Sequence, residues 1–204
     1  PSLKYMIAPP HMGLYMEVSA DIYRTYLTLF AKEDVYPYSI DECFVHVTPY
    51  LSLYGKDGME MASMMMKAVY DRTGICATAG VGTNLFLAKT GMDIVAKHVP
   101  EHIAYLDETL FREKLWHHRP ITDIWNIGHG IARRLEKYGV YDLYGVTLLP
   151  EKVLYREFGV NAEYLIDHAH GRESCTLEDI RSYRPENRSR ARKKHRVQSG
   201  TKYG

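Results

Sequence analysis

Two neighbouring carboxylates, Asp41 and Glu42, are the residues whose types and spacing most directly suggest chemistry in this sequence. On a regular strand, adjacent side chains point to opposite faces of the sheet, so the two carboxylates would not share a site. At a hairpin turn they escape that alternation and can converge on a hard cation such as Mg²⁺, which is usually held by one or two carboxylates plus water and substrate phosphates. An Asp-Glu pair in a turn is more often simply a polar turn, so spacing alone leaves both interpretations open.

A second group begins at Gly80 and Gly82, reaches Lys89, and continues to Asp93 and Lys97. A strand, a glycine-rich turn and a capped helix in this order could present backbone N–H groups to a phosphate. The glycine spacing, however, matches neither a P-loop nor a dinucleotide-binding fingerprint. A sharp strand-to-helix turn, followed by a packed helix with both lysines in solvent, is the interpretation that the residues alone favour.

The third group is the stretch 121–135, which is typical of a helix, a tight turn and a second helix. Gly128 and Gly130 in that turn would let a phosphate approach the backbone N–H groups at the start of the second helix. Nearby cations would add counter-charge, and they are Arg133, Arg134 and Lys137. Contacts of this kind bind a nucleic-acid backbone without reading its sequence. The pattern therefore favours non-specific DNA binding over a purely structural helical hairpin.

The composition of the 204 residues is that of a folded globular protein, with 46% hydrophobic and 12% aromatic residues. This apolar content excludes disorder for most of the chain. No stretch approaches the roughly 20 apolar residues of a membrane span, and no signal peptide opens the sequence. Three distant cysteines without a CxxC spacing exclude a disulfide framework or zinc knuckle and favour a reducing cytoplasm.

The near-neutral net charge of +1 is unevenly distributed along the sequence. Residues 181–204 contain nine Lys and Arg residues and one acidic residue, Glu186, and so carry +8. Residues 1–180, with 17 basic and 24 acidic side chains, carry −7. An acidic body with a basic arm is compatible with a nucleic-acid partner and equally with a solvated linker.

Hydrophobic periodicity and turn residues predict the elements that must position these groups. The first half is expected to contain helices at 15–32, 58–72 and 84–97, a hairpin within 35–50 and a strand at 75–81. After about residue 102 the strands give out, and helices are expected at 108–117, 131–137, 151–158 and 161–169. The predicted fold class is α+β, with antiparallel strands covered by helices on one face, followed by a small all-helical domain.

Taken together and in this order, the three groups resemble the Y-family (translesion) DNA polymerases, most closely the UmuC-like branch. Residues 38–44 are similar to the palm motif of that family, residues 80–89 to its strand-turn-helix, and residues 124–128 to its thumb helix-hairpin-helix. The resemblance implies a palm-like sheet covered by helices and a helical thumb. The implied domains are a partial palm at 1–106, a helical thumb at 107–178 and a basic linker or tail at 179–204.

The resemblance also implies roles for particular residues. Asp41 and Glu42 would be two of three carboxylates that hold two catalytic Mg²⁺ ions, and Lys97 would meet the incoming triphosphate. The implied DNA-binding residues lie in and after the thumb turn, and they are Ile127, Gly128, Gly130, Arg133, Arg134 and Lys137. Members of the family carry the first catalytic Asp on an earlier strand, followed by fingers, and end in a little-finger domain. This chain has no match to those parts.

The implied function is damage-tolerant addition of nucleotides to a primer 3′ end by two-metal phosphoryl transfer, with the chain itself an inactive palm-and-thumb fragment. The implied partners are primer-template DNA and a deoxynucleoside triphosphate, and a sliding clamp or accessory subunit through regions outside this chain. The resemblance further implies a bacterial cytoplasmic protein of the nucleoid without membrane contact. The alternative hypothesis is a non-catalytic helix-hairpin-helix module that binds DNA within a repair assembly.

Overall fold

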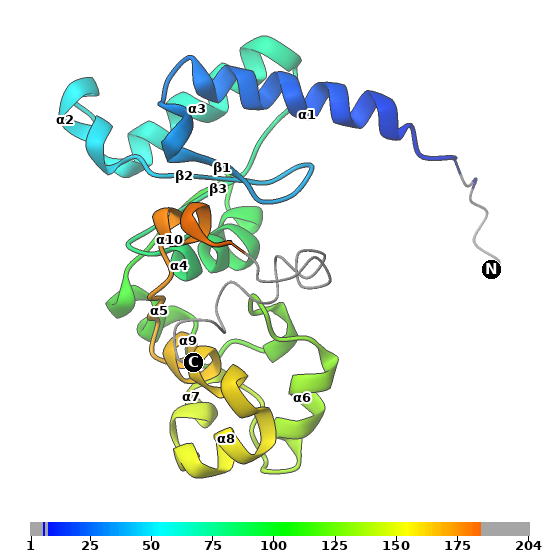
Figure 1. Cartoon of the computed structure of the whole chain (residues 1–204), viewed down its shortest axis with the longest axis vertical. Helices are drawn as coiled ribbons and strands as arrows, with labels where there is room; N and C mark the ends of the chain where they lie inside the picture. The colour runs from blue at the N-terminus through cyan, green and yellow to red at the C-terminus, as the bar shows by residue number, and fades with distance from the viewer. Residues whose placement is uncertain (1–5, 7, 185–204) are drawn as a thin grey trace.

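The structure is a computed structural model that describes residues 6 and 8–184. The predicted basic linker or tail therefore lies almost entirely outside the described residues. In the first half of the chain, helix α1 (Met12–Leu27) packs along helix α3 (Gly58–Thr73), as Figure 1 shows. Asp57 and Glu60 form a capping box at the start of α3, and Gly74 ends the helix in the left-handed conformation. The prediction of this helix is confirmed.

The predicted hairpin is also confirmed. Strands β1 (Val35–Pro37) and β2 (Cys43–Val45) pair antiparallel, with Val35 opposite Val45 and Pro37 opposite Cys43. Residues 38–42 form the connecting turn, which is closed by hydrogen bonds from the Tyr38 and Ser39 N–H groups to the Glu42 carbonyl. Two short helical segments follow the hairpin, η2 (Thr48–Tyr50) and α2 (Leu51–Tyr54).

The expectation that strands end after residue 102 is wrong. Strand β4 (Ile103–Leu106) pairs parallel with β3 (Ala79–Gly82) and forms a second two-stranded sheet. The described strands are therefore partly parallel, whereas the sequence favoured antiparallel strands alone. Four residues, with Ala104 and Leu106 buried and Tyr105 exposed, are too short for a reliable periodic signal, and pairing with β3 stabilises them.

The helix expected at 84–97 is interrupted. It consists of α4 (Leu85–Thr90), a π-turn η3 (Gly91–Val95) and a 3-10 turn η4 (Ala96–His98). Asn84 caps it by accepting a hydrogen bond from the Leu87 N–H group. Turns with π geometry are frequent at functional sites.

The part of the chain after β4 is helical, as predicted. It contains α5 (Glu108–Lys114), η5 (Ile121–Asp123), α6 (His129–Glu136), α7 (Leu143–Thr147), α8 (Glu151–Phe158), η6 (Gly159–Asn161), α9 (Ala162–Ala169) and α10 (Leu177–Ser182). Helix α8 has the predicted bounds, α6 begins two residues early and ends one residue early, and α5 ends three residues before the predicted helix end. The predicted first helix of the hairpin around residue 124 is only the single 3-10 turn η5. No helix in the described part of the chain is both long enough and apolar enough to cross a bilayer.

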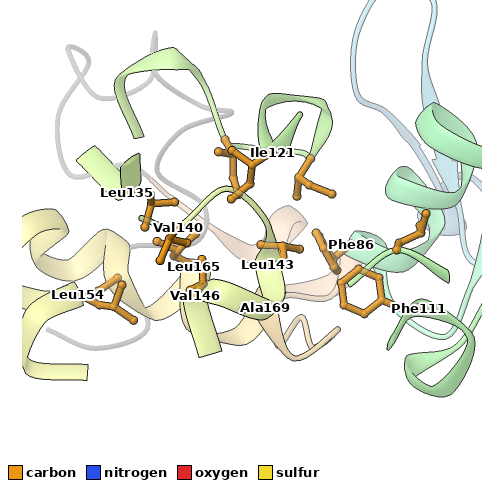
Figure 2. Close-up of a cluster of buried hydrophobic side chains, with 14 of the residues drawn as sticks. Phe86, Phe111, Ile121, Leu135, Val140, Leu143, Val146, Leu154, Leu165 and Ala169 are labelled. Atoms are coloured by element: carbon orange, nitrogen blue, oxygen red, sulfur yellow. The ribbon is translucent and has the colours of Figure 1, made fainter. Parts of the chain in front are cut away.

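One hydrophobic core joins the two halves (Figure 2). Phe86 of α4 and Phe111 of α5 lie at one end of the cluster, and Leu135 and Leu154 of the helical part lie at the other. A smaller separate cluster, centred on Phe30, Val35 and Met61, lies beneath α1, α3 and the hairpin. The elements that carry the candidate residues are therefore fixed to one another mainly through α4.

Candidate active site

The β1–β2 turn presents both predicted carboxylates, but in different environments. Asp41 is exposed, and its Oδ1 accepts a hydrogen bond from Ser39 Oγ at 2.7 Å. Glu42 is half-buried, and its Oε1 accepts a hydrogen bond from Lys89 Nζ at 2.7 Å. The two side chains lie in a turn outside the paired strands, and each has a different partner; the predicted convergence of both carboxylates on one cation stays a prediction.

Lys89 is the residue at this site that the sequence interpretation placed wrongly. It was expected in solvent, yet it is only 8% exposed. Its ammonium group lies 2.7 Å from Glu42 Oε1 and 2.7 Å from Asp93 Oδ2. Asp93 in turn pairs through Oδ1 with Lys97 Nζ at 2.9 Å. The predicted Glu42 and Lys97 therefore belong to one chain of ion pairs, connected by Lys89 and Asp93.

The pKa shifts in this chain of ion pairs follow from its geometry. Burial alone would lower the pKa of Lys89, but hydrogen bonds to Asp93 and Glu42 outweigh burial and raise it above its ordinary value. Burial alone would raise the pKa of Asp93, but its bonds to Lys89 and Lys97 hold it below the ordinary value. Lys89 and Asp93 are therefore both charged at neutral pH, and this pairing compensates the desolvation of the lysine.

A cavity of about 170 Å³ lies between the hairpin and the second sheet. Its walls come from β2, α3, β3 and α4, and both Glu42 and Lys89 line it. The Tyr38 ring lines the same cavity and lies 6.0 Å from the Lys89 ammonium group. Asp41 does not line the cavity. The Glu42–Lys89 pair thus forms a charged part of the lining of this cavity, which is otherwise mostly apolar.

The oxygen donors at the turn fit a hard divalent cation in their chemistry. Asp41 and Glu42 supply two carboxylates, and each has one carboxylate oxygen outside the hydrogen bonds described above. Among the described residues, no group of three or more His, Cys, Asp or Glu side chains is placed to hold a metal ion. Asp41 and Glu42 would therefore supply only part of a Mg²⁺ ligand set, and water and phosphate oxygens would have to complete it.

Gly80 and Gly82 serve packing rather than phosphate binding. A Cβ atom at Gly80 would lie 1.9 Å from the Ala88 carbonyl oxygen, and one at Gly82 would lie 2.3 Å from the Ala88 amide nitrogen. Strand β3 approaches the backbone of α4 so closely that only glycine fits. This close approach is what brings Lys89 beneath the hairpin turn.

The helical half presents the second predicted binding element, the loop that precedes α6. Gly128 is the N-terminal cap residue of α6, and nothing lies within 4 Å of a Cβ atom placed at Gly128 or Gly130. The first N–H groups of a helix lack partners within that helix, so this end is suited to an anion. The loop also forms the rim of a hollow of about 830 Å³, against α9.

Some of the predicted DNA-binding residues are accessible, and others are engaged in contacts within the protein. Gly128, Gly130, Arg133 and Lys137 are exposed. In contrast, the guanidinium group of Arg134 donates to the Glu157 carbonyl at 2.6 Å and lies over the Phe158 ring at 4.5 Å.

Ile127 is likewise not accessible to a ligand. Its side chain is buried in the main core, and its N–H group already donates to the Ile124 carbonyl at 3.0 Å. Arg134 and Ile127 therefore stabilise the loop through their contacts. The two glycines, Arg133 and Lys137 remain accessible to a ligand.

Comparison with known proteins agrees with this arrangement. Residues 2–93 match the impB/mucB/samB family. The UV-damage repair protein UvrX of Bacillus subtilis is 30% identical over 165 residues, which are 81% of this chain and 38% of UvrX. DNA polymerase IV 2 of the same organism is 28% identical over 81% of this chain and 39% of its own length. The chain thus spans well under half the length of these relatives.

Solved structures give the same result. An insertion ternary complex of Dbh DNA polymerase superposes with a TM-score of 0.69 at 26% identity, covering 83% of this chain and 48% of that one. The fold, mixed from helices and small sheets, matches the palm of these polymerases. Residues 2–93 match the impB/mucB/samB family, and over most of its length the chain is similar to DNA polymerases of the Y family.

Proposed function

We propose that this chain is the palm and thumb portion of a translesion DNA polymerase, with the palm at 1–106 and the thumb at 107–178. The observation that carries the proposal is the ion-pair chain from Glu42 through Lys89 and Asp93 to Lys97. It connects a carboxylate suited to a metal ion with an exposed cation suited to a triphosphate. The partners would be primer-template DNA and a deoxynucleoside triphosphate.

In this proposal Asp41 and Glu42 hold the metal ions. When bound, two Mg²⁺ ions supply a lowered pKa for the primer 3′-hydroxyl and neutralise charge on the α-phosphate and pyrophosphate. Ser39 orients Asp41, and Lys89 orients Glu42. Lys97, 52% exposed, meets the triphosphate from the same face of the helix as Asp93. Because no group of three possible metal ligands is found among the described residues, we propose that the chain alone does not polymerise.

The loop before α6, with η5 ahead of it, would act as the helix-hairpin-helix of the thumb. Gly128 and Gly130 would offer N–H groups to a DNA phosphate, and Arg133 and Lys137 would add counter-charge. Ile127 and Arg134, which are also among the proposed DNA-binding residues, would act from behind by fixing the loop. Phosphate contacts of this kind bind duplexes of any sequence.

Replacement of the carboxylates tests the metal assignment. We expect Asp41→Ala or Glu42→Ala to abolish primer extension by a longer polymerase that carries this sequence, while its DNA affinity changes less than about threefold. Binding of Mn²⁺ to the 204-residue chain, followed by electron paramagnetic resonance, should fall in both variants. Glu33→Ala, which changes another carboxylate just before the same hairpin, is the matched control. Undiminished extension in Asp41→Ala and Glu42→Ala would contradict the assignment.

Gly130→Ala is expected to change DNA affinity and folding stability in opposite directions. Alanine has a higher helix propensity than glycine by up to about 1 kcal/mol, and open space surrounds this position, so the variant should unfold at higher urea concentration. The added methyl group would obstruct a phosphate, so the affinity for a duplex should fall at least about fivefold. Titration of a fluorescent duplex and urea unfolding give the two readings. A gain in stability with unchanged affinity would place the DNA elsewhere.

A further inference from the structure

The turn that carries the carboxylates and the loop that faces DNA touch each other through one side chain, Trp125. Its indole N–H donates to the Tyr38 hydroxyl at 2.9 Å, across 87 residues of sequence. The ring also meets the rings of Tyr38 and Phe44, at centroid distances of 5.9 and 6.1 Å. Tyr38 begins the carboxylate turn, and Trp125 lies just before the Gly128 loop.

Trp125 also contacts the helical half of the chain. It stacks on His168, with ring centroids 5.9 Å apart and planes 17° from parallel. His168 is 2% exposed, stacks on Phe86 at 4.1 Å, and pairs with Glu173 at 3.0 Å. Aromatic contacts therefore run without a gap from the hairpin to the core of α4. Packed side chains transmit a displacement to the neighbours that they contact.

The loop that follows Trp125 is short and anchored on both sides. Asn126 has a φ of +67°, a conformation that a residue other than glycine rarely adopts. Ile124 and Ile127, on either side of this pair, are buried at 2% and 5% exposure and hold the loop in place. A phosphate bound at Gly128 would press on a short, anchored loop whose rigid side chain is Trp125.

We infer that Trp125 is a positioning residue that couples DNA binding at the Gly128 loop to the geometry of the carboxylate turn. The inference rests on the proposed function. The Tyr38 ring lies between Trp125 and the Lys89–Glu42 pair, so a shift of the indole reaches the metal-binding carboxylate through Tyr38. Coupling between two sites is reciprocal, so DNA should tighten cation binding and the cation should tighten DNA binding by the same factor.

The two tryptophans of the chain provide a matched test. Trp125→Phe removes the indole N–H while keeping an aromatic ring. Trp116→Phe removes a similar bond, from the Trp116 indole to the Ala169 carbonyl at 2.7 Å, inside the helical half. Mn²⁺ would be titrated into each 204-residue chain by electron paramagnetic resonance, with and without a short primer-template duplex. A general loss of packing would affect both variants alike.

In the unchanged chain and in Trp116→Phe, the duplex should lower the Mn²⁺ dissociation constant at least about fivefold. In Trp125→Phe this factor should fall toward one, while Mn²⁺ binding without DNA stays within about twofold. Equal factors in both variants, or no effect of the duplex in the unchanged chain, would overturn the inference. If the duplex still binds in those cases, only the coupling is contradicted and the proposed DNA interface stands. Failure of the coupling can therefore be distinguished from failure of the DNA interface.

If Mn²⁺ binds too weakly to titrate, amide hydrogen exchange tests the inference. The Tyr38 and Ser39 amides donate within the turn to the Glu42 carbonyl. Duplex binding should slow their exchange in the unchanged chain and in Trp116→Phe, but not in Trp125→Phe. Equal slowing in all three chains would overturn the coupling. A chain that binds no duplex would contradict the proposed DNA interface, and the inference would fail with it.

Discussion

The Lys89 ammonium group sets the local geometry of the candidate active site. It is placed by the helix cap at Asn84 and by the close approach of β3 to α4, and it holds Glu42 and Asp93 at equal distances. Burial of a lysine costs free energy unless carboxylates compensate its charge. Lys89 and its two partners must therefore be considered as one unit, in which each charge keeps the others in position.

Lys89→Met is expected to lower the free energy of unfolding by about 1–3 kcal/mol, because two half-buried carboxylates lose a charged hydrogen-bond donor. Urea unfolding followed by circular dichroism at pH 7 measures this change. Lys67→Met is the control, since Lys67 forms an i,i+4 pair with Asp71 in which both side chains are largely exposed. That variant should stay within about 0.5 kcal/mol. Equal effects of the two substitutions would contradict the role given to Lys89.

Three of the short helices of the second half, α5, α7 and α10, begin at a side-chain cap. Asp142, 4% exposed, begins α7 by accepting the Gly145 N–H group at 2.8 Å, and it also accepts a bond from Arg119 at 2.8 Å. Burial would raise the pKa of Asp142, but these two bonds together hold it below its ordinary value. A helix of five residues has little intrinsic stability, so its cap decides whether it forms.

The lowered pKa of Asp142 gives a pH dependence with a definite sign. The charged form is favoured by folding, so its contribution is present above the unfolded pKa of about 4 and is lost as the pH falls through the folded value. Asp142→Asn should cost about 1–3 kcal/mol at pH 7 and should reduce the loss of stability between pH 5 and pH 3. Urea midpoints across this range measure both effects.

Asp107→Asn is the control for Asp142, because Asp107 caps α5 through the Leu110 N–H group alone among its described bonds. It should cost less than Asp142→Asn at pH 7. An unchanged acid dependence in Asp142→Asn would show that other carboxylates account for it.

The whole molecule is held by two apolar clusters of unequal size. The larger one continues from α4 and α5 through α9 (Figure 2), whereas the smaller one gathers beneath α1 and the hairpin. Helix α1 has no fully buried residue, although it packs on α3. Local unfolding free energy follows buried contacts, so the stability of the chain should be unequal along its length.

Hydrogen exchange should therefore follow the clusters. We expect the amides of α1 to exchange first and those of α4 and α9 last, at rates close to those of global unfolding. Exchange followed by mass spectrometry at neutral pH measures this order. Phe86→Ala should accelerate α4 and α9 together, because Phe86 stacks on His168 of α9. Acceleration of α4 alone would show that the two halves unfold independently.

Several parts of this organisation could be predicted from residues alone. The hairpin around Asp41, the capped helix ending at Gly74 and the helical second half follow from local patterns that depend on neighbours in sequence. The same patterns located the carboxylate turn and the Gly128 loop as separate candidates. Strand β4 escaped prediction because its pairing partner lies more than 20 residues away.

The sequence by itself determined which residue types are present and which turns and helices they favour, because those preferences are local. Only the tertiary structure decided that Lys89 is buried between two carboxylates, that Arg134 is occupied by α8, and that Trp125 reaches Tyr38. Each of these facts depends on how far β3 approaches α4 and how the helical half packs on Phe86. Such distances arise from the packing of distant segments, for which one sequence contains no periodic signal.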